Sequence, residues 1–319
     1  MFHHRTVLLQ PAIERLAPVA GGTYIDATFG GGGHSLALLE ASAPNGRVIG
    51  LDRDPDAIAH GQRLVEGSDT RLSLHHTPFS GLSTVLETVG PPAPDGILFD
   101  LGVSSHQLDR AERGFSFRHD GPLDMRMNGK DDHCPTAADL VNTLEQEALA
   151  NLLYTYGEER RSRRAARAIL QHRKSHPLTT TGALADLLAR VLPRNKKGHH
   201  PATRCFQALR IAVNGELDEL QSGLDQAMKQ VAVGGRVAVI SFHSLEDRIV
   251  KRAFQAACRP RILLDSWGRQ RQRDEALFRP VTRKPIEPDA RETDDNPRAR
   301  SARLRVVERT ASERNDDYS

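Results

Sequence analysis

One stretch near the N-terminus constrains the fold more than any other. A β-prone run, Thr23–Asp26, ends in an acid, four glycines follow at 30–33, and the run 36–40 has the composition of a helix. Strand, glycine turn and helix in this order open a doubly wound nucleotide-binding fold. Glycine suits the turn because the chain reverses with unusual dihedrals and a cofactor approaches bare backbone. We therefore predict an α/β fold.

The spacing of these glycines separates two cofactor classes. A dinucleotide fingerprint, G-x-G-x-x-G, beginning at Gly30 needs a sixth-position glycine where Ser35 stands. The pattern acid-x-G-x-G-x-G beginning at Asp26 has Thr28 in place of its first glycine, with Gly30 and Gly32 at the other two. The second pattern is typical of S-adenosylmethionine sites, although a tight turn without a ligand remains an alternative, since a glycine-rich turn alone is weak support.

Two further β-prone runs also deliver acids. The run 47–52 ends in Asp52, and the run 96–99 is followed by Asp100. Ligands of open α/β sheets bind outside the carboxyl ends of the strands, so we expect Asp26, Asp52 and Asp100 to face one crevice. Asp52 lies about 20 residues beyond the glycine turn, where a carboxylate accepts hydrogen bonds from ribose hydroxyls. A helix cap is the alternative role for Asp52.

A fourth β-prone run, 71–75, precedes Phe79. An aromatic ring at this place stacks in an offset manner against an adenine. From position alone, a ring that anchors the loop in the core is an equal alternative.

The composition is that of a soluble protein, with 38% hydrophobic and 27% charged residues in a chain of 319. Its three cysteines, Cys134, Cys205 and Cys258, form no C-x-x-C pair, which argues against a disulfide framework or a zinc site. Charged residues Glu14 and Arg15 precede any long apolar run, so no signal peptide is expected. No stretch approaches the roughly 20 apolar residues of a membrane span. We therefore expect a cytoplasmic protein without a metal site.

The strand and helix alternation stops after Asp100 and resumes with a β-prone run at 236–242. The residues between, above all 136–192, have helical patterns, and Thr136 with Asp139 is a candidate cap. We therefore predict a core made of residues 1–108 and 215–319, with residues 109–214 as an inserted, mainly helical, basic substrate-binding domain.

Positive charge is concentrated in this insertion. Residues 157–210 contain thirteen Lys or Arg and three acids, a balance of +10 in a chain whose net charge is +3. Such asymmetry indicates a lobe that meets a polyanion, although a solvated helix face is the usual meaning of a charge run. The candidate phosphate-binding residues form two groups: Arg160, Arg163, Arg164 and Arg167 on one helix face, and Arg194, Lys196 and Lys197 beside Gly198.

The C-terminal part contains a basic stretch with Arg269, Arg271 and Arg273, and two short β-like runs, Pro280–Lys284 and Leu304–Glu308. An antiparallel pair at this point closes the seven-stranded sheet of a class I methyltransferase. We expect these two runs to form it.

Motifs over nearly the whole chain are similar to those of one family, the bacterial 16S ribosomal RNA cytosine-N4 methyltransferases (MraW or RsmH family). The matching segments are 26–35, 51–54, 100–105, 113–127, 156–159, 202–217, 240–248 and 296–301. Two positions depart from the family pattern: Gln10 stands where Glu is usual, and His106 stands where Pro is common. The second departure affects the loop that carries Gln107.

The resemblance implies a class I S-adenosylmethionine-dependent methyltransferase, Rossmann-like, with a seven-stranded doubly wound sheet and an inserted helical domain. It implies S-adenosyl-L-methionine as methyl donor and the N4 amine of a cytidine in the decoding region of 16S ribosomal RNA as acceptor. By position, the cofactor contacts of the family carry over onto Gly32, Gly33, His34, Asp52, Phe79, Asp100 and Gln107. The implied partner is 16S ribosomal RNA, within the small ribosomal subunit, and no membrane.

The acceptor chemistry gives further candidates. A conjugated cytosine amine is a weak nucleophile, so groups that accept its protons assist transfer. Asn214, Ser241 and His243 are candidates for the cytosine pocket, each with an equal alternative as a structural hydrogen-bonding residue. No catalytic base is assigned. Carbon-5 methylation is disfavoured because no cysteine lies at a strand end to act as nucleophile.

Two rival functions stay open on the sequence. One is a nicotinamide-dependent oxidoreductase with Asp52 on the ribose, which Ser35 disfavours. The other is an RNA-binding protein with this fold and no catalysis, which the three strand-end acids disfavour. A monomer and a homodimer are both compatible with the sequence, as are free RNA and the assembled subunit as substrate, with or without magnesium.

Overall fold

The computed structural model describes residues 6–65, 70–129, 133–193, 200–264 and 270–310. Its chain forms two compact units. The first contains residues up to Gly102 and from Asp218 onward, and the second contains Val103–Leu217. The second unit thus begins at 103 where the sequence suggested 109, and ends at 217 where it suggested 214.

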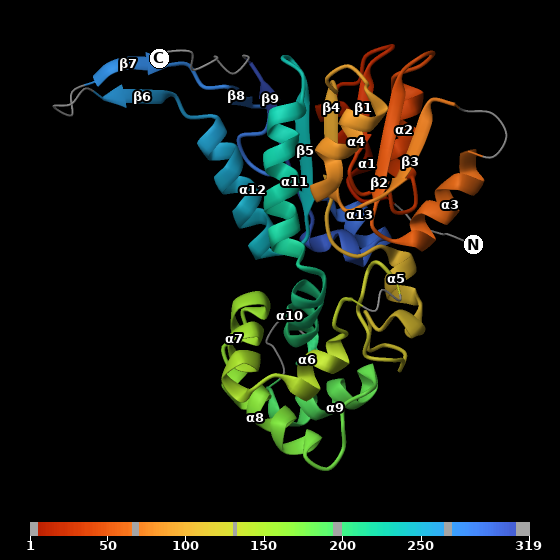
Figure 1. The fold of residues 1–319 in the computed structure, drawn as a ribbon, viewed down its shortest axis with the longest axis vertical. Helices are drawn as coiled ribbons and strands as arrows, with labels where there is room; N and C mark the ends of the chain where they lie inside the picture. Colours follow the sequence, from red (N-terminus) through yellow and green to blue (C-terminus); the bar gives the residue numbers. More distant parts are fainter. Residues whose placement is uncertain (1–5, 66–69, 130–132, 194–199, 265–269, 311–319) are drawn as a thin grey trace. The chain divides into compact units, whose positions relative to one another are not determined.

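The first unit is built on one seven-stranded sheet (Figure 1). Its strands are β1 (Thr23–Asp26), β2 (Arg47–Asp52), β3 (Leu72–His76), β4 (Gly96–Asp100), β5 (Arg236–Ser241), β8 (Phe278–Pro280) and β9 (Arg303–Arg309). Their order is β3-β2-β1-β4-β5-β9-β8. The first five are parallel, whereas β9 runs antiparallel to β5 and to β8. This is the class I methyltransferase sheet, so the predicted fold class is confirmed.

The central strands read as continuous apolar runs because both faces of the sheet are covered. Successive side chains point to opposite faces, so Ile97 and Phe99 of β4 belong to one core cluster, and Leu98 between them belongs to another. Alternate side chains of one strand therefore contribute to the two cores on opposite faces of the sheet.

Each face of the sheet has its own helices. One core receives α4 (Leu82–Val89), α11 (Glu216–Gln230) and α12 (Ser244–Ala257). The other receives α1 (Leu9–Leu16), α2 (Gly33–Ala41) and the η3 turn (Pro297–Ser301). The remaining helical elements of this unit are α3 (Pro55–Val65), η1 (Phe79–Gly81) and α13 (Ala290–Asp295).

The C-terminal strands differ from the prediction. The expected strand 280–284 is instead β8, Phe278–Pro280, although the N–H groups of Val281 and Thr282 still bond to the carbonyl of Val306. The basic stretch forms strand β7 (Gln270–Asp274), paired antiparallel with β6 (Arg261–Leu264). Strand β7 has the sequence QRQRD and no apolar residue, so the sequence pattern did not predict this hairpin. Arg269 lies outside the described residues.

The second unit is helical. Its elements are α5 (Ser105–Asp109), η2 (Ala111–Arg113), α6 (Ala137–Thr143), α7 (Gln146–Gly157), α8 (Ser162–Arg173), α9 (Thr181–Val191) and α10 (Thr203–Asn214). The predicted cap of α6 is a capping box between Thr136 and Asp139. The unit has a core of its own, in which Leu149, Ile169 and Leu188 are fully buried.

Three of the predicted arginines are exposed on α8, but Arg160 is not on the helix. Arg163, Arg164 and Arg167 lie on its exposed face, and Ala165, Ala166 and Ile169 on its buried face. Arg160 precedes the helix in a turn, since α8 begins at Ser162. The second basic group, Arg194, Lys196 and Lys197, lies outside the described residues together with Gly198.

In the described part of the chain, no helix combines the length and the apolar character needed to cross a membrane.

Candidate cofactor site of the first unit

The strand order places a binding crevice between β1 and β4. The chain moves outward from β1 to β3 on one side and returns beside β1 with β4, so the order reverses between these two strands. Ligands of open α/β sheets bind at such a reversal, outside the carboxyl ends of the strands. The last residues of β1 and β4 are Asp26 and Asp100.

The glycine turn connects β1 to α2 through two left-handed residues. Gly30 has φ 52°, and Gly32, which caps α2, has φ 79°. Residues with a Cβ adopt these values at a cost. The turn aims the Gly30 N–H at the carboxylate of Asp52, with 2.8 Å from N to Oδ2. Gly33 and His34 follow in the first turn of α2.

Asp26 is fully buried and holds the turn together. Its Oδ2 accepts a 2.7 Å hydrogen bond from the hydroxyl of Ser35, and its Oδ1 accepts the N–H of Thr28. Burial raises the pKa of Asp26 to about 6, and these hydrogen bonds oppose the shift. Asp26 is therefore a structural acid of the crevice.

Asp52, at the end of β2, is partly exposed and has one backbone N–H on each oxygen. Gly30 donates to Oδ2 and Asp54 donates to Oδ1, each at 2.8 Å. Burial raises its pKa to about 6, opposed by these two bonds and assisted by the nearby charges of Asp54 and Asp26. Each carboxylate oxygen accepts more than one hydrogen bond, so Asp52 has capacity for the hydroxyls of a ligand.

Asp100, at the end of β4, has a buried oxygen, Oδ1, without a hydrogen-bond partner among the described residues. Its other oxygen lies 3.6 Å from Nδ1 of His34, and its backbone N–H donates to the hydroxyl of Thr28. Burial, followed by the charges of Asp26 and Glu246, holds the pKa of Asp100 well above its usual range. A buried acceptor of this kind indicates a donor supplied by a ligand.

Together, the acids favour a ligand with positive charge and hydroxyl donors. Asp26 acts electrostatically on both Asp52 and Asp100, so the three side chains share one region, as predicted from the strand ends. A cation in this region lowers the cost of ionising them. S-adenosylmethionine has a sulfonium, an ammonium and two ribose hydroxyls, and the carboxylate acceptors of the crevice fit these groups.

Phe79 lies in the short turn η1 after β3 and is half-buried. Its ring packs edge-on against Phe99, with centroids 5.7 Å apart, and lies directly against Gly223 of α11. These contacts are those of a loop anchor, one of its two predicted roles. Contact with an adenine remains a prediction.

Two predicted residues belong to the second unit. Gln107 is buried in α5, where its side chain accepts the N–H of Ser104 in a capping box. Asn214 is buried near the end of α10, where it accepts the N–H of Met127 and donates to the carbonyl of Met125. The amide of Asn214 therefore fixes the irregular segment 113–127 within this unit.

Ser241 is the last residue of β5, the strand beside β4, and His243 follows two residues later. His243 caps α12: its Nδ1 accepts the N–H of Glu246, and its Nε2 lies 3.2 Å from Oε1 of Glu246. The hydroxyl of Ser241 is buried and donates to the carbonyl of Arg303. Both side chains have structural partners, and their contact with substrate stays a prediction.

Thr28 and Glu246 were missed as site residues. In the sequence, Thr28 is only a departure from the glycine pattern. In the structure its hydroxyl, in the turn after β1, accepts the backbone N–H of Asp100. Glu246 acts electrostatically on Asp100 from the first turn of α12. A signal for Glu246 exists in the sequence, since an acid three residues after a cap is a capping-box position.

Comparison with known sequences decides the family. The model of the MraW methylase family matches residues 1–310. The chain belongs to this family.

Relatives of the chain carry one consistent name. The ribosomal RNA small subunit methyltransferase H of Magnetococcus marinus is 54% identical over 313 residues, which is 97% of this chain and 99% of that protein. The proteins of the same name from Nitrobacter hamburgensis and Geobacter sp. are 52% and 48% identical, covering 97% of this chain in both cases and 91% and 99% of the relatives. The resemblance drawn from the motifs is thereby confirmed for this MraW methylase.

Proposed function

We propose that this MraW methylase transfers a methyl group from S-adenosylmethionine to the N4 amine of a cytidine in the decoding region of 16S ribosomal RNA. The observation that carries the proposal is the family match over residues 1–310. The name of the relatives, ribosomal RNA small subunit methyltransferase H, supports ribosomal RNA as the substrate. The sequence resemblance supports the N4 amine and the decoding region.

The proposed cofactor contacts follow the chemistry of the crevice. Asp52 would accept the ribose hydroxyls, and the backbone at Gly32 and Gly33 would border the cofactor at the start of α2. His34, Asp100, Phe79 and Gln107 complete the proposed contacts. When bound, S-adenosylmethionine supplies an activated methyl group on a sulfonium.

The buried Oδ1 of Asp100 is suited to accept a hydrogen bond from an amine in the crevice. Burial raises the pKa of this carboxyl, so it holds a proton more strongly than an ordinary aspartate does. We keep Asp100 as a cofactor contact and assign no catalytic base. Asn214 and His243 are the proposed substrate-binding residues.

The target base must reach the crevice, so it is expected to be unpaired or flipped out of its helix. The exposed arginines of α8 are the proposed contacts to surrounding phosphates. The proposed partner is the small ribosomal subunit or its free RNA, in the cytoplasm, with the protein as a monomer or homodimer.

The deciding experiment uses S-adenosylmethionine with a labelled methyl group and small ribosomal subunits that lack this modification. The product nucleosides are then resolved by mass spectrometry. Label in N4-methylcytidine supports donor, acceptor atom and substrate class together. Label in another nucleoside would reject the proposed acceptor atom and still support a methyltransferase activity. Absence of label with bound S-adenosylmethionine rejects these subunits as the substrate.

A nicotinamide cofactor is tested by calorimetry. Binding of NAD without binding of S-adenosylmethionine would reject the proposal. Asp52→Ala is expected to remove S-adenosylmethionine binding, and normal methylation by this variant would reject the ribose assignment.

A further inference from the structure

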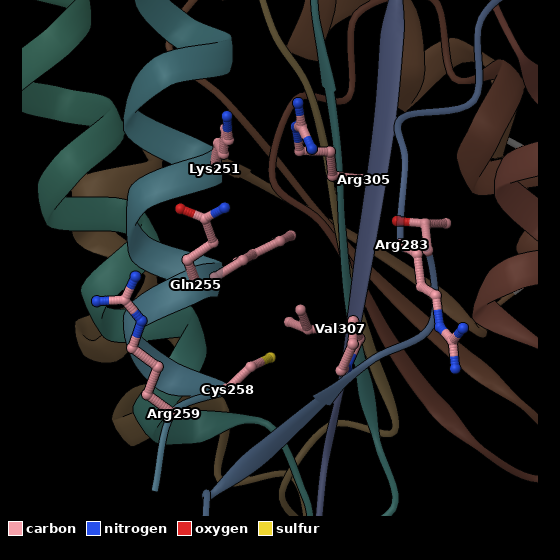
Figure 2. Close-up of a pocket in the computed structure, with 10 residues that line it drawn as sticks. Lys251, Gln255, Cys258, Arg259, Arg283, Arg305 and Val307 are labelled. Atoms are coloured by element: carbon pink, nitrogen blue, oxygen red, sulfur yellow. The ribbon is translucent and has the colours of Figure 1, made fainter. Parts of the chain in front are cut away.

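A second pocket lies in the first unit, with walls from α12 and from the C-terminal strands β8 and β9 (Figure 2). Its volume is about 340 Å³. It is lined by Lys251, Phe254, Gln255, Cys258, Arg259, Pro280, Thr282, Arg283, Arg305 and Val307. None of these residues belongs to the proposed cofactor or substrate contacts.

The rim of this pocket is cationic. Four of the lining residues are Lys or Arg, and none is acidic. Arg305 is paired with Asp247, Nε to Oδ1 at 2.7 Å, so its charge is largely balanced. Lys251, Arg259 and Arg283 are exposed, and no carboxylate forms an ion pair with them among the residues whose side chains the structure describes, which leave out 261–274. The pocket therefore presents about three uncompensated positive charges.

The floor of the pocket is apolar. Phe254 and Val307 are buried at 6% and 1% exposure, and Pro280 lies beside them. The thiol of Cys258 also lines the pocket, and burial raises its pKa, so it stays neutral. An apolar floor beneath cations and the polar side chains of Gln255 and Thr282 suits a ligand with a flat ring and a negative group.

The partial charge at the C-terminal end of α12 favours one orientation of such a ligand in the pocket. The helix ends at Ala257, and its C-terminal end carries partial negative charge, next to Cys258 and Arg259. In Figure 2, Lys251 and Arg305 lie together at the opposite end of the pocket. An anionic group is therefore favoured at the end near Lys251, with a ring over Phe254 and Val307.

We propose that this pocket binds one nucleotide, with its phosphate near Lys251 and its base on the apolar floor. The chemistry is shared by a nucleotide within an RNA chain and by a free nucleotide. The RNA chain as source rests on the proposed function, because a ribosomal RNA substrate presents many phosphates beyond the methylated base.

The first test measures binding of a fluorescent single-stranded RNA oligonucleotide to the full chain over a series of salt concentrations. The double variant Lys251→Glu/Arg283→Glu is expected to bind about tenfold more weakly at low salt, with a salt slope reduced by about 0.7, since the pocket holds one phosphate and each single-strand phosphate contact contributes about 0.7. The matched control is Arg63→Glu/Lys229→Glu, which makes the same charge change outside the pocket. Equal affinities and slopes for both double variants would overturn the proposal.

A second measurement needs no pocket variant and is independent of folding defects. The rate of alkylation of Cys258 is measured in the wild-type protein, with Cys134 as reference in the same sample. Bound RNA is expected to slow alkylation of Cys258 at least fivefold more than that of Cys134, by shielding. Protection by cytidine monophosphate at an equal nucleotide concentration assigns the free nucleotide, and protection by RNA alone assigns the chain. Unchanged labelling with both probes overturns the proposal.

Failure of this inference is distinct from failure of the proposed function. Protection of Cys258 without methyl transfer to small subunits would support nucleotide binding in the pocket and reject the proposed function. Methyl transfer with unprotected Cys258 would support the proposed function and reject nucleotide binding in the pocket.

Discussion

At the scale of single residues, small hydroxyl side chains determine how the glycine turn is held. Ser35 occupies the position at which a dinucleotide motif has glycine, and it donates to the buried Asp26 at 2.7 Å. Thr28 occupies a glycine position of the S-adenosylmethionine pattern, and it accepts the backbone N–H of Asp100. Ser35 therefore joins α2 to the last residue of β1, and Thr28 joins the turn after β1 to Asp100 at the end of β4.

Ser35→Ala is expected to destabilise the fold by about 1–3 kcal/mol, because it removes a hydrogen bond to a buried carboxylate. The matched control is Ser42→Ala. Its hydroxyl is also buried and donates at 2.7 Å, but to the carbonyl of Leu38 in its own helix. Urea unfolding of both variants measures the difference. An equal loss of stability in the two variants would contradict this role of Ser35.

The raised pKa values of Asp26 and Asp52 predict pH-dependent binding of S-adenosylmethionine. Both carboxyls have a pKa of about 6 in the folded chain, so they take up protons as pH falls through 6. Their ionised forms favour the sulfonium and the ribose hydroxyls. Affinity should therefore fall by about tenfold per essential carboxylate from pH 7 to pH 5.

Calorimetry at these two pH values, in buffers of different ionisation enthalpy, also measures the protons released on binding. S-adenosylhomocysteine, which lacks the positive sulfonium, is the control and should depend less on pH. The same shifts mean that these two groups stabilise the ligand-free fold fully below pH 3.8, a contribution that is lost as pH rises through about 6. A pH-independent affinity would contradict the prediction.

At the scale of elements, helix α8 has two faces with different roles. Ala165, Ala166 and Ile169 are fully buried in the core of the second unit. Arg163, Arg164 and Arg167 are exposed on the other face. Charge reversal on the exposed face therefore leaves the packing intact and tests binding alone.

The variant Arg163→Glu/Arg167→Glu is expected to bind RNA more weakly, with a salt slope lower by about 1.4, because two phosphate contacts are lost. Fluorescence anisotropy with a single-stranded oligonucleotide measures both quantities, and circular dichroism checks the helix content. Arg63→Glu/Lys229→Glu provides the same charge change in the first unit. If the α8 variant and this control bind alike, the arginines are a solvated face.

At the scale of the whole molecule, the chain contains two units, each with its own core. The core of the second unit is drawn from residues 115–213 alone. The cores on both sides of the sheet are drawn from the first unit. Unfolding of one unit therefore removes no core residue from the other.

We expect S-adenosylmethionine to shift mainly the thermal transition of the first unit, because the acids of the crevice belong to it and Gln107 is the one proposed cofactor contact in the second unit. At a ligand concentration of 100 times Kd, its free energy of unfolding should rise by about 2.7 kcal/mol. Differential scanning calorimetry of the full chain measures this, and residues 103–217 expressed alone identify the second transition. A single transition that shifts as a whole would contradict independent units.

The sequence by itself determined the sheet, the glycine turn and the positions of the strand-end acids, because these depend on local patterns. Short continuous apolar runs mark strands that are buried on both faces, and a glycine cluster marks a turn with left-handed residues. Asp26, Asp52 and Asp100 could be proposed as one group once parallel strands were expected. Strand β7 contains no apolar residue, so the sequence did not predict its hairpin with β6.

Only the tertiary structure decided what surrounds each of these side chains. The buried oxygen of Asp100 and the raised pKa values depend on neighbours far away in sequence, such as Glu246. The sequence left two roles open for Phe79, and its packing against Phe99 and Gly223 shows that it anchors the loop. The cationic pocket likewise joins Lys251 to Arg283 and Arg305 across separate elements. Contacts between distant segments form only when the chain is folded, so a local sequence pattern cannot predict them.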